Sequence, residues 1–195
     1  MDISCHTWAF TDLTLTEALG TIARMGFRHV DIGSGQHVNA AKAAVNPRRA
    51  AADIADDLAL YKLRVADLYL MLPRISSPEE DKRAKEIEVF KAMLPFAAAL
   101  PSAGITLSPG LAQPAEDTEA YSRAADALRE MMSAAREVGS PLSIEPHLDS
   151  LAAAPAVALK LLDDVPGLQL TLDWAHMVCQ DVFHEEIVKL IPRAR

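Results

Sequence analysis

The feature that most constrains the fold of this chain is a strict alternation of strand-like and helix-like patterns. Six short apolar runs rich in β-branched residues are each followed by a segment whose apolar positions have helical spacing. Strands are expected at about residues 2–4, 27–33, 64–72, 104–110, 141–147 and 168–176. Such alternation is typical of α/β proteins, in which parallel strands are joined by right-handed helical crossovers.

Capping residues mark where the helices begin. TLTE, starting at Thr14, has the pattern of a capping box, and NP, starting at Asn46, supplies a cap followed by a first-turn proline. The third helix opens at Ser77 and would carry Pro95 in its interior. Because an interior proline costs about 3 kcal/mol, we expect a kink or a break near this residue.

Two architectures share this alternation, an open doubly wound sheet and a (β/α)₈ barrel. A nucleotide-binding open sheet would carry a glycine-rich phosphate loop after its first strand. Here the first strand leads into CHTWAFTD, residues 5–12, which contains no glycine. The sequence therefore favours an α/β fold with a parallel barrel of the TIM type. We expect one domain over residues 1–195, since this length suffices for one large core and is short for two.

Charge and composition limit the classes of partner that the chain is expected to bind. Acidic residues outnumber basic ones by 27 to 19, giving a net charge of −8, and no basic stretch is interleaved with aromatic residues. Nucleic acid is therefore an unexpected partner. The N-terminus lacks a basic n-region, and no apolar run reaches the roughly 18 residues of a membrane span, so we expect a cytoplasmic protein without a membrane partner. Cys5 and Cys179 form no CxxC pair and are expected to stay reduced.

Two of the strand-like runs end in a carboxylate that a histidine follows closely. LSIEPH places Glu145 two residues before His147, and LTLDWAH places Asp173 three residues before His176. In a parallel barrel the C-terminal strand ends face one pocket, and neighbouring strands lie about 4.8 Å apart, so both carboxylates could reach one cation. Binding a divalent cation would relieve their repulsion, and mixed oxygen and nitrogen donors suit Mn²⁺, Mg²⁺ or Co²⁺.

Each carboxylate taken alone has a plainer explanation. An aspartate at a strand end often caps the next helix, and a glutamate there often pairs with Arg or Lys. The coincidence of two such strand ends favours a functional site.

Weaker candidates lie nearer the N-terminus. His6 and Trp8, at the end of the first strand, could line a substrate pocket or close the mouth of the core. Asp31 could hold a sugar hydroxyl, although capping the glycine loop is favoured. GSGQH at residues 33–37 is a weak phosphate-loop signal, for which an ordinary loop is favoured.

Four stretches of the chain, ISCHTWAF, EALGTIARMGFRHVDIG, IEPH and LTLDWAH, carry a family resemblance. At these residues the chain resembles the xylose isomerase-like TIM-barrel superfamily, in particular its sugar phosphate isomerase and epimerase group. The resemblance implies that Glu145 and Asp173 are metal ligands and that His176 contacts the substrate.

If the resemblance holds, two of the family's metal-binding residues are expected to be missing from this sequence. The family completes its metal site with a histidine from strand seven and a glutamate from strand eight, which would lie beyond Arg195. A complete barrel of this type has about 250 residues, so we expect about six of the eight βα units, in a domain that is C-terminally incomplete. The first and sixth strands would then be unpaired edges, and a homo-oligomer could follow.

The resemblance leads to one functional hypothesis. It implies a metal-dependent isomerase or epimerase acting on a sugar, sugar phosphate or cyclitol by proton transfer next to a carbonyl, through an enediolate. The divalent cation is expected to be Mn²⁺, with Mg²⁺, Co²⁺ or Zn²⁺ as alternatives. Glu145 would act as the acid or base, and the substrate-binding residues would be His176, His147, His6 and Trp8.

Two other functions remain open at this point. A truncated barrel could be catalytically inactive and act as a metal-binding, sugar-binding or interaction protein. An endonuclease-IV-like abasic-site nuclease is disfavoured, because the chain is acidic and lacks the additional His and Glu that a three-zinc cluster needs in the earlier strands.

Overall fold

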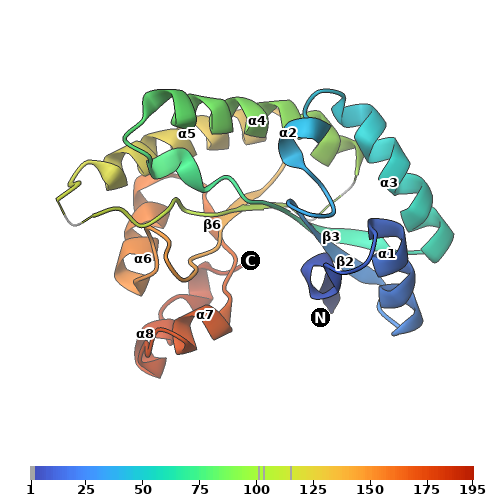
Figure 1. Cartoon of the computed structure of the whole chain (residues 1–195). Coiled ribbons are helices and arrows are strands. Elements are labelled where there is room, and N and C mark those ends of the chain that lie inside the picture. The colour runs from blue at the N-terminus through green and yellow to red at the C-terminus, as the bar shows by residue number, and fades with distance from the viewer. Residues whose placement is uncertain (1–2, 101, 103, 115) are drawn as a thin grey trace. The chain divides into compact units, whose positions relative to one another are not determined.

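The structure is a computed structural model that describes residues 3–100, 102, 104–114 and 116–195. Strands and helices alternate along these residues (Figure 1). The strands are β1 (Ser4–His6), β2 (His29–Gly33), β3 (Arg64–Leu70), β4 (Ile105–Leu107), β5 (Leu142–Ile144) and β6 (Gln169–Leu170). The α-helices are α1 (Leu15–Arg24), α2 (Ala40–Ala43), α3 (Pro47–Tyr61), α4 (Glu80–Ala99), α5 (Ala120–Glu137), α6 (Pro155–Asp164), α7 (Trp174–Val178) and α8 (His184–Val188). Short 3₁₀ helices are η1 (Thr7–Phe10), η2 (Pro73–Ser76) and η3 (Ile191–Arg193).

The strands form one sheet in the order β1-β2-β3-β4-β5-β6, which is also their order in the sequence. This order, with a helical connection after each strand, confirms the predicted parallel α/β class. The described residues divide into two compact units, residues 1–71 with 89–105 and residues 72–88 with 106–195, which we call the first and second units. The division passes through α4. No helix among the described residues is long and apolar enough to cross a membrane.

The first unit is built as the local sequence predicts. At the start of α1 the capping box forms in both directions, since Thr14 Oγ1 accepts from the Glu17 N–H and Glu17 Oε2 accepts from the Thr14 N–H. The apolar face of α1 buries Leu19 and Ile22 completely. β1 pairs with β2 in parallel, from Ser4 opposite His29. The first strand was expected at about residues 2–4, and β1 instead covers Ser4–His6, while Asp2 lies outside the described residues.

A kink or a break was expected near Pro95, and helix α4 runs through this residue without a break. Pro95 is exposed and lies in the last turns of the helix, where only one backbone hydrogen bond is lost. The residues beside it, Leu94 and Phe96, are buried, and Leu100 N–H still donates to Phe96 O at 3.1 Å. Packing of this apolar face offsets the cost of the proline.

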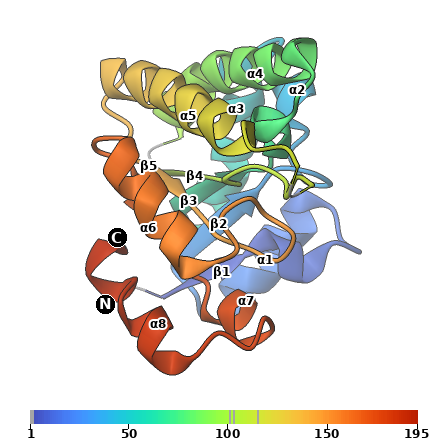
Figure 2. The ribbon, with the colours of Figure 1, turned by 90° about the vertical axis from the view of Figure 1, so that its left-hand side faces the viewer.

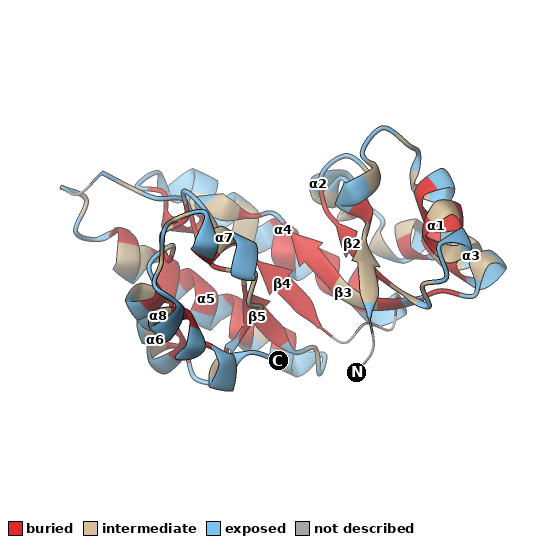
Figure 3. Cartoon of the chain, turned by 90° about the horizontal axis from the view of Figure 1, so that it is seen from below, coloured by how far each residue is buried: buried red, intermediate tan, exposed pale blue. Residues whose placement is uncertain are grey.

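The second unit has its core between β4, β5 and the apolar stripe of α5. Both strands are buried along their whole length (Figure 3). Ala124, Leu128 and Met131 of α5 are fully buried.

The sixth strand is shorter than predicted. β6 covers only Gln169–Leu170, although Thr171 N–H still donates to Ile144 O at 2.9 Å. Its far edge is not bare, which corrects the expectation of an unpaired edge. Ala194 forms a parallel bridge with Leu170, and Arg195 N–H donates to Leu170 O at 3.1 Å. The C-terminus lies beside α6, where Arg193 pairs with Asp163 at 2.7 Å (Figure 2).

Candidate active site

Glu145 directly follows β5 and is half-buried. Its backbone N–H donates to Leu107 O, the last residue of β4, at 2.9 Å. The sheet therefore fixes the backbone at the point where the predicted carboxylate ligand leaves strand five.

His147, two residues further on, is held through both ring nitrogens. Nε2 lies 2.8 Å from Ser108 Oγ, and Nδ1 lies 2.7 Å from the carbonyl oxygen of Leu148. The backbone N–H of His147 also donates to Ser150 Oγ at 3.2 Å. Both nitrogens of this predicted substrate-binding ring are thus engaged within the protein, and these two contacts fix the orientation of the ring.

Asp173 lies two residues beyond the sheet-paired Thr171 and is the N-cap of α7. Its Oδ1 accepts the Ala175 N–H at 2.8 Å. One carboxylate oxygen of Asp173 therefore caps the helix, as the plainer interpretation of this residue expects. The other oxygen, Oδ2, lies 3.7 Å from His176 Nε2. His176 was expected at the end of the sixth strand and is instead in α7, because the cap at Asp173 starts a helix there.

The two predicted strand ends come together. The ring centroids of His147 and His176 lie 5.9 Å apart, with the ring planes inclined by 54°. His147 belongs to the segment after β5 and His176 to the segment after β6, and these strands are paired from Ser143 opposite Gln169. The geometry therefore brings Asp173 and the two imidazoles close together in the second unit, with Glu145 two residues before His147 at the end of β5.

The donors fit only part of a metal site. Carboxylate oxygens such as those of Glu145 and Asp173 suit hard divalent cations, which take about six ligands. Among the described residues, no group of three or more His, Cys, Asp or Glu side chains is arranged to hold a metal ion. His147 offers no free nitrogen as a further ligand. A cation held here would need ligands that this group does not supply.

The loops after β4 and β5 are fastened to each other. Leu151 N–H donates to Gly110 O at 2.8 Å, and Ala112 N–H donates to Asp149 O at 2.9 Å. Leu111 and Ser150 form an antiparallel bridge between these hydrogen bonds. The segment that begins at Glu145 is therefore tied to the segment that begins at Ser108.

The turn η2 is hydrogen-bonded to the loop after β4. Leu111 N–H donates to Pro73 O at 2.9 Å, and Ser76 Oγ donates to Leu111 O at 2.8 Å. Gly110 has φ +107°, and a Cβ there would lie 2.8 Å from Ser76 Cβ. Only glycine fits this close approach.

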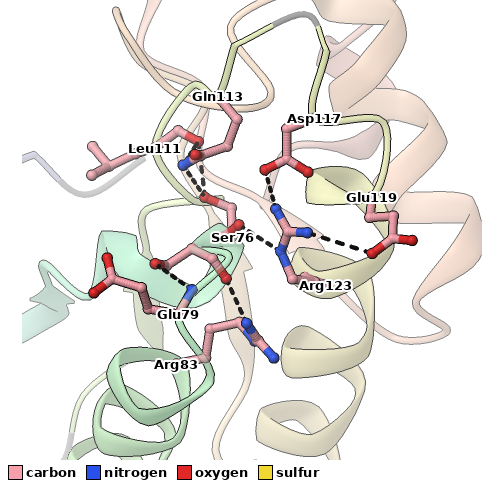
Figure 4. Close-up of polar contacts among 9 residues, drawn as sticks. Ser76, Glu79, Arg83, Leu111, Gln113, Asp117, Glu119 and Arg123 are labelled. Atoms are coloured by element: carbon pink, nitrogen blue, oxygen red, sulfur yellow. Dashed lines mark hydrogen bonds and ion pairs between the residues drawn. The ribbon is translucent and has the colours of Figure 1, made fainter.

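Arg123 of α5 fixes η2 in turn (Figure 4). Its Nε donates to Ser76 O at 3.0 Å, while its guanidinium also pairs with Asp117 and lies 3.9 Å from Glu119. The Arg123 hydrogen bond holds the pKa of Asp117 below its usual value. No local sequence pattern marks this network, because its members are up to 47 residues apart.

Glu86 of α4 reaches the other side of η2. Its Oε2 accepts the Arg74 N–H at 2.5 Å. Burial raises the pKa of Glu86 to about 7, and the hydrogen bond and charge of Arg74 only partly oppose this effect. This carboxyl therefore changes charge near neutral pH while it caps the turn.

In the first unit, the ends of β1 to β3 carry an aromatic cluster. The Trp8 ring lies 4.9 Å from the His6 ring and 5.0 Å from that of Tyr69. Trp8 Nε1 donates to Ser34 O at 3.2 Å, and His6 Nδ1 accepts the Trp8 N–H at 3.0 Å. A Cβ on Gly33 would lie 2.3 Å from Trp8 Nε1, so the ring packs directly on this glycine.

The cluster contains two residues named in the sequence analysis, His6 and Trp8, and one that was not. The rings of His6 and Trp8 lie side by side, and Trp8 is 36% exposed, so part of the cluster faces solvent. Burial lowers the pKa of His6, against an opposing effect of Asp31. Tyr69, the third ring, was missed, although its place near the end of β3 follows the same rule of functional strand ends.

The loop at residues 33–37 is an ordinary loop, as the sequence favoured. Ser34 N–H donates to Tyr69 O at 2.7 Å, and Gly35 N–H donates to Val38 O at 2.8 Å. These amides are used within the protein and do not form a phosphate cradle. Asp31 accepts a hydrogen bond from Ser4 Oγ at 2.5 Å.

Comparison with known families decides the relationship of the chain. The sequence profile of a family described as xylose isomerase-like TIM barrel matches residues 19–194. The chain belongs to this family. The predicted family and barrel class are thereby confirmed, and the described residues form a six-stranded sheet.

Solved structures of the same fold include several xylose isomerase-like proteins. A D-psicose 3-epimerase solved with D-fructose has a TM-score of 0.81 at 16% identity, covering 100% of this chain and 71% of that chain. A 3-keto-D-glucoside 4-epimerase from E. coli has 0.79 at 16%, covering 100% and 76%. A xylose isomerase-like TIM barrel protein from Mycobacterium smegmatis in complex with magnesium has 0.78 at 17%, covering 100% and 72%. At these identities the likeness is one of fold. No curated protein sequence matches this xylose isomerase-like chain.

Proposed function

We propose that this chain carries part of the active site of a metal-dependent isomerase or epimerase. The substrate would be a sugar, sugar phosphate or cyclitol with a hydroxyl next to a carbonyl. The observation that carries the proposal is the approach of the His147 and His176 rings to 5.9 Å, which places the segments bearing Glu145 and Asp173 together. Two similar folds, the D-psicose and 3-keto-D-glucoside epimerases, support the substrate class.

Glu145 and Asp173 are the proposed metal-holding residues. Asp173 uses Oδ1 to cap α7, so Oδ2 is the oxygen that would serve a cation. A divalent cation bound there would polarise the carbonyl and stabilise the charge that develops when the neighbouring carbon loses its proton. Mn²⁺ is the proposed ion, and the magnesium complex of the Mycobacterium smegmatis protein supports a divalent cation in general.

The side chains of this chain would hold the substrate and move its proton. Glu145, half-buried at the end of β5, would accept the proton from carbon and return it. His176 would orient a substrate oxygen through a ring that Asp173 Oδ2 faces at 3.7 Å. His147 would form the wall beside it. In the first unit, the exposed part of the His6 and Trp8 cluster is a proposed sugar-binding surface.

A thermal melt with and without Mn²⁺ tests the metal pair. A ligand that binds only the folded state stabilises it by about 2.7 kcal/mol at 100 times its Kd, so the melting midpoint should rise. Asp173→Asn and Glu145→Gln should abolish the rise. Asn is as good a helix cap as Asp, so Asp173→Asn keeps α7 intact, whereas Asp173→Ala should also cost about 1 kcal/mol of stability. An equal Mn²⁺ response in wild type and Asp173→Asn would contradict the assignment.

Exchange in D₂O tests the chemistry. A ketohexose incubated with the chain and Mn²⁺ should gain deuterium at the carbon next to the carbonyl, as mass spectrometry would detect. Glu145→Gln should abolish this exchange. Retained exchange in that variant would rule out Glu145 as the base.

One observation favours a second candidate, a protein that binds metal or sugar without turnover. The described residues include no group of three or more metal-binding side chains, so the chain lacks a full ligand set among them. This candidate predicts an Mn²⁺ response in the melt without any deuterium exchange.

The remaining predictions concern context. The cytoplasmic location, the lack of a nucleic-acid partner and a homo-oligomeric state are proposed from charge and sequence alone. A single domain over residues 1–195 likewise stays a prediction.

A further inference from the structure

A buried serine touches the ring that forms the fixed side of the site. Ser108 directly follows β4 and is fully buried, and its Oγ lies 2.8 Å from His147 Nε2. On the opposite side of the ring, Nδ1 lies 2.7 Å from the Leu148 carbonyl oxygen. A carbonyl oxygen only accepts, so Nδ1 carries the ring proton. Nε2 of the neutral ring then accepts the hydrogen bond that the Ser108 hydroxyl donates.

The backbone on both sides of this contact is held as well. Glu145 N–H donates to Leu107 O one residue before Ser108, and Leu151 N–H donates to Gly110 O two residues after it. The His147 ring therefore cannot turn over or change tautomer without losing at least one hydrogen bond, since the segments that carry the two residues do not shift freely.

We propose that Ser108 is a positioning residue, whose hydroxyl donates to His147 Nε2 and holds the ring in one orientation beside His176, while the Leu148 carbonyl keeps the proton on Nδ1. The ring is thereby a fixed wall at 5.9 Å from the His176 ring and leaves His176 facing Asp173. The role of the His147 ring in shaping a substrate pocket rests on the proposed function. The serine-to-histidine contact itself does not.

The chain supplies a matched control in Ser143. Ser143 is in β5, is also fully buried, and its Oγ has no hydrogen-bond partner within the described part of the chain. Ser108→Ala and Ser143→Ala each remove one buried hydroxyl and nothing else. Only the first leaves a partner atom, His147 Nε2, without its donor.

The test is long-range ¹H–¹⁵N NMR of the histidine side chains in the full chain, with His147 assigned through His147→Gln. Wild type and Ser143→Ala should show one protonated nitrogen, Nδ1, and one unprotonated nitrogen, Nε2. Ser108→Ala should keep the proton on Nδ1 but shift the ¹⁵N resonance of Nε2, which loses its hydrogen-bond donor, and Ser108→Thr should restore the wild-type Nε2 resonance through its hydroxyl.

Two outcomes would overturn the proposal. One is an unchanged Nε2 resonance of His147 in a folded Ser108→Ala variant. The other is an averaged pattern in wild type itself, which needs no variant to fold.

The same spectra separate this proposal from the proposed function. Mn²⁺ bound to Glu145 and Asp173 should broaden the His147 and His176 signals, because the ion is paramagnetic. A single His147 tautomer without any broadening would contradict the metal pair and leave the positioning role of Ser108 intact.

Discussion

The ends of β5 and β6 carry the same two residue types, a carboxylate and a histidine, and hold them in different ways. After β5, the His147 ring is fixed at both nitrogens, and its loop is fastened to the loop after β4. After β6, His176 lies in a five-residue helix, and its ring faces Asp173 at 3.7 Å, too far for a hydrogen bond.

Because of this difference, the segments after β5 and β6 would have different roles in the proposed site. A ring whose nitrogens are both engaged can shape a pocket but cannot bind a substrate atom without giving up a partner. A half-exposed ring without such bonds can accept or donate to a ligand. In the proposed function, the fixed side after β5 would provide geometry, and the side after β6 would provide the substrate contact that the family resemblance implies for His176.

Gly110→Ala should damage the fixed side most. The new Cβ would lie 2.8 Å from Ser76 Cβ, at a residue with φ +107°. Steric overlap and backbone strain together should cost about 3–5 kcal/mol, measured by urea denaturation. The loop after β4, which contains Ser108 and accepts the Leu151 N–H at Gly110 O, would be displaced with it.

Gly139→Ala is the matched control in the same unit. Gly139 closes α5 at φ +70°, and a Cβ there would meet nothing within 4 Å. Only the left-handed backbone should matter, at about 1 kcal/mol. Equal losses for the two variants would show that the contact with Ser76 does not support the loop.

Glu86→Gln should change how the support of the fixed side responds to pH. Burial raises the folded-state pKa of Glu86 to about 7 from 4.5, so the folded state binds this proton more tightly than the unfolded state. The resulting stabilisation is complete below pH 4.5 and is lost as the pH rises through 7. A permanently neutral Gln avoids that loss.

The variant should therefore match wild type near pH 4.5 and exceed it at pH 8. Partial solvent exposure reduces the expected difference to about 1–2 kcal/mol, measured by urea denaturation across pH. Glu88→Gln, an exposed position on the same helix, should show no such difference. A pH-independent effect of Glu86→Gln would contradict a buried carboxyl under η2.

Local chemistry explains which features could be read from the sequence. The Thr14 and Glu17 capping box, the proline at the start of α3 and the carboxylate after β5 all depend on residues a few positions apart. The approach of Glu145 to the segment of Asp173 followed from the rule that parallel strand ends meet at one edge.

The missed features depend on partners distant in sequence. Ser108 is 39 residues from His147, and Arg123 is 47 residues from Ser76, so no local pattern marks either contact. The early end of β6 reflects competition between two local signals. The apolar run predicted a strand as far as His176, while the Asp173 side chain caps a helix three residues earlier.

The mildest test leaves the protein unaltered and compares the two histidines directly. Diethyl pyrocarbonate modifies imidazole nitrogens that present an accessible lone pair. His176, with a side chain 32% exposed, should react several-fold faster than His147, whose Nε2 lone pair accepts from Ser108. Peptide mass spectrometry over time measures both rates in one sample, and His184, which is exposed, gives the reference rate. Equal rates would mean that the hydrogen bonds of His147 open as readily as the surroundings of His176, and the contrast between a fixed side and a contact side would not hold.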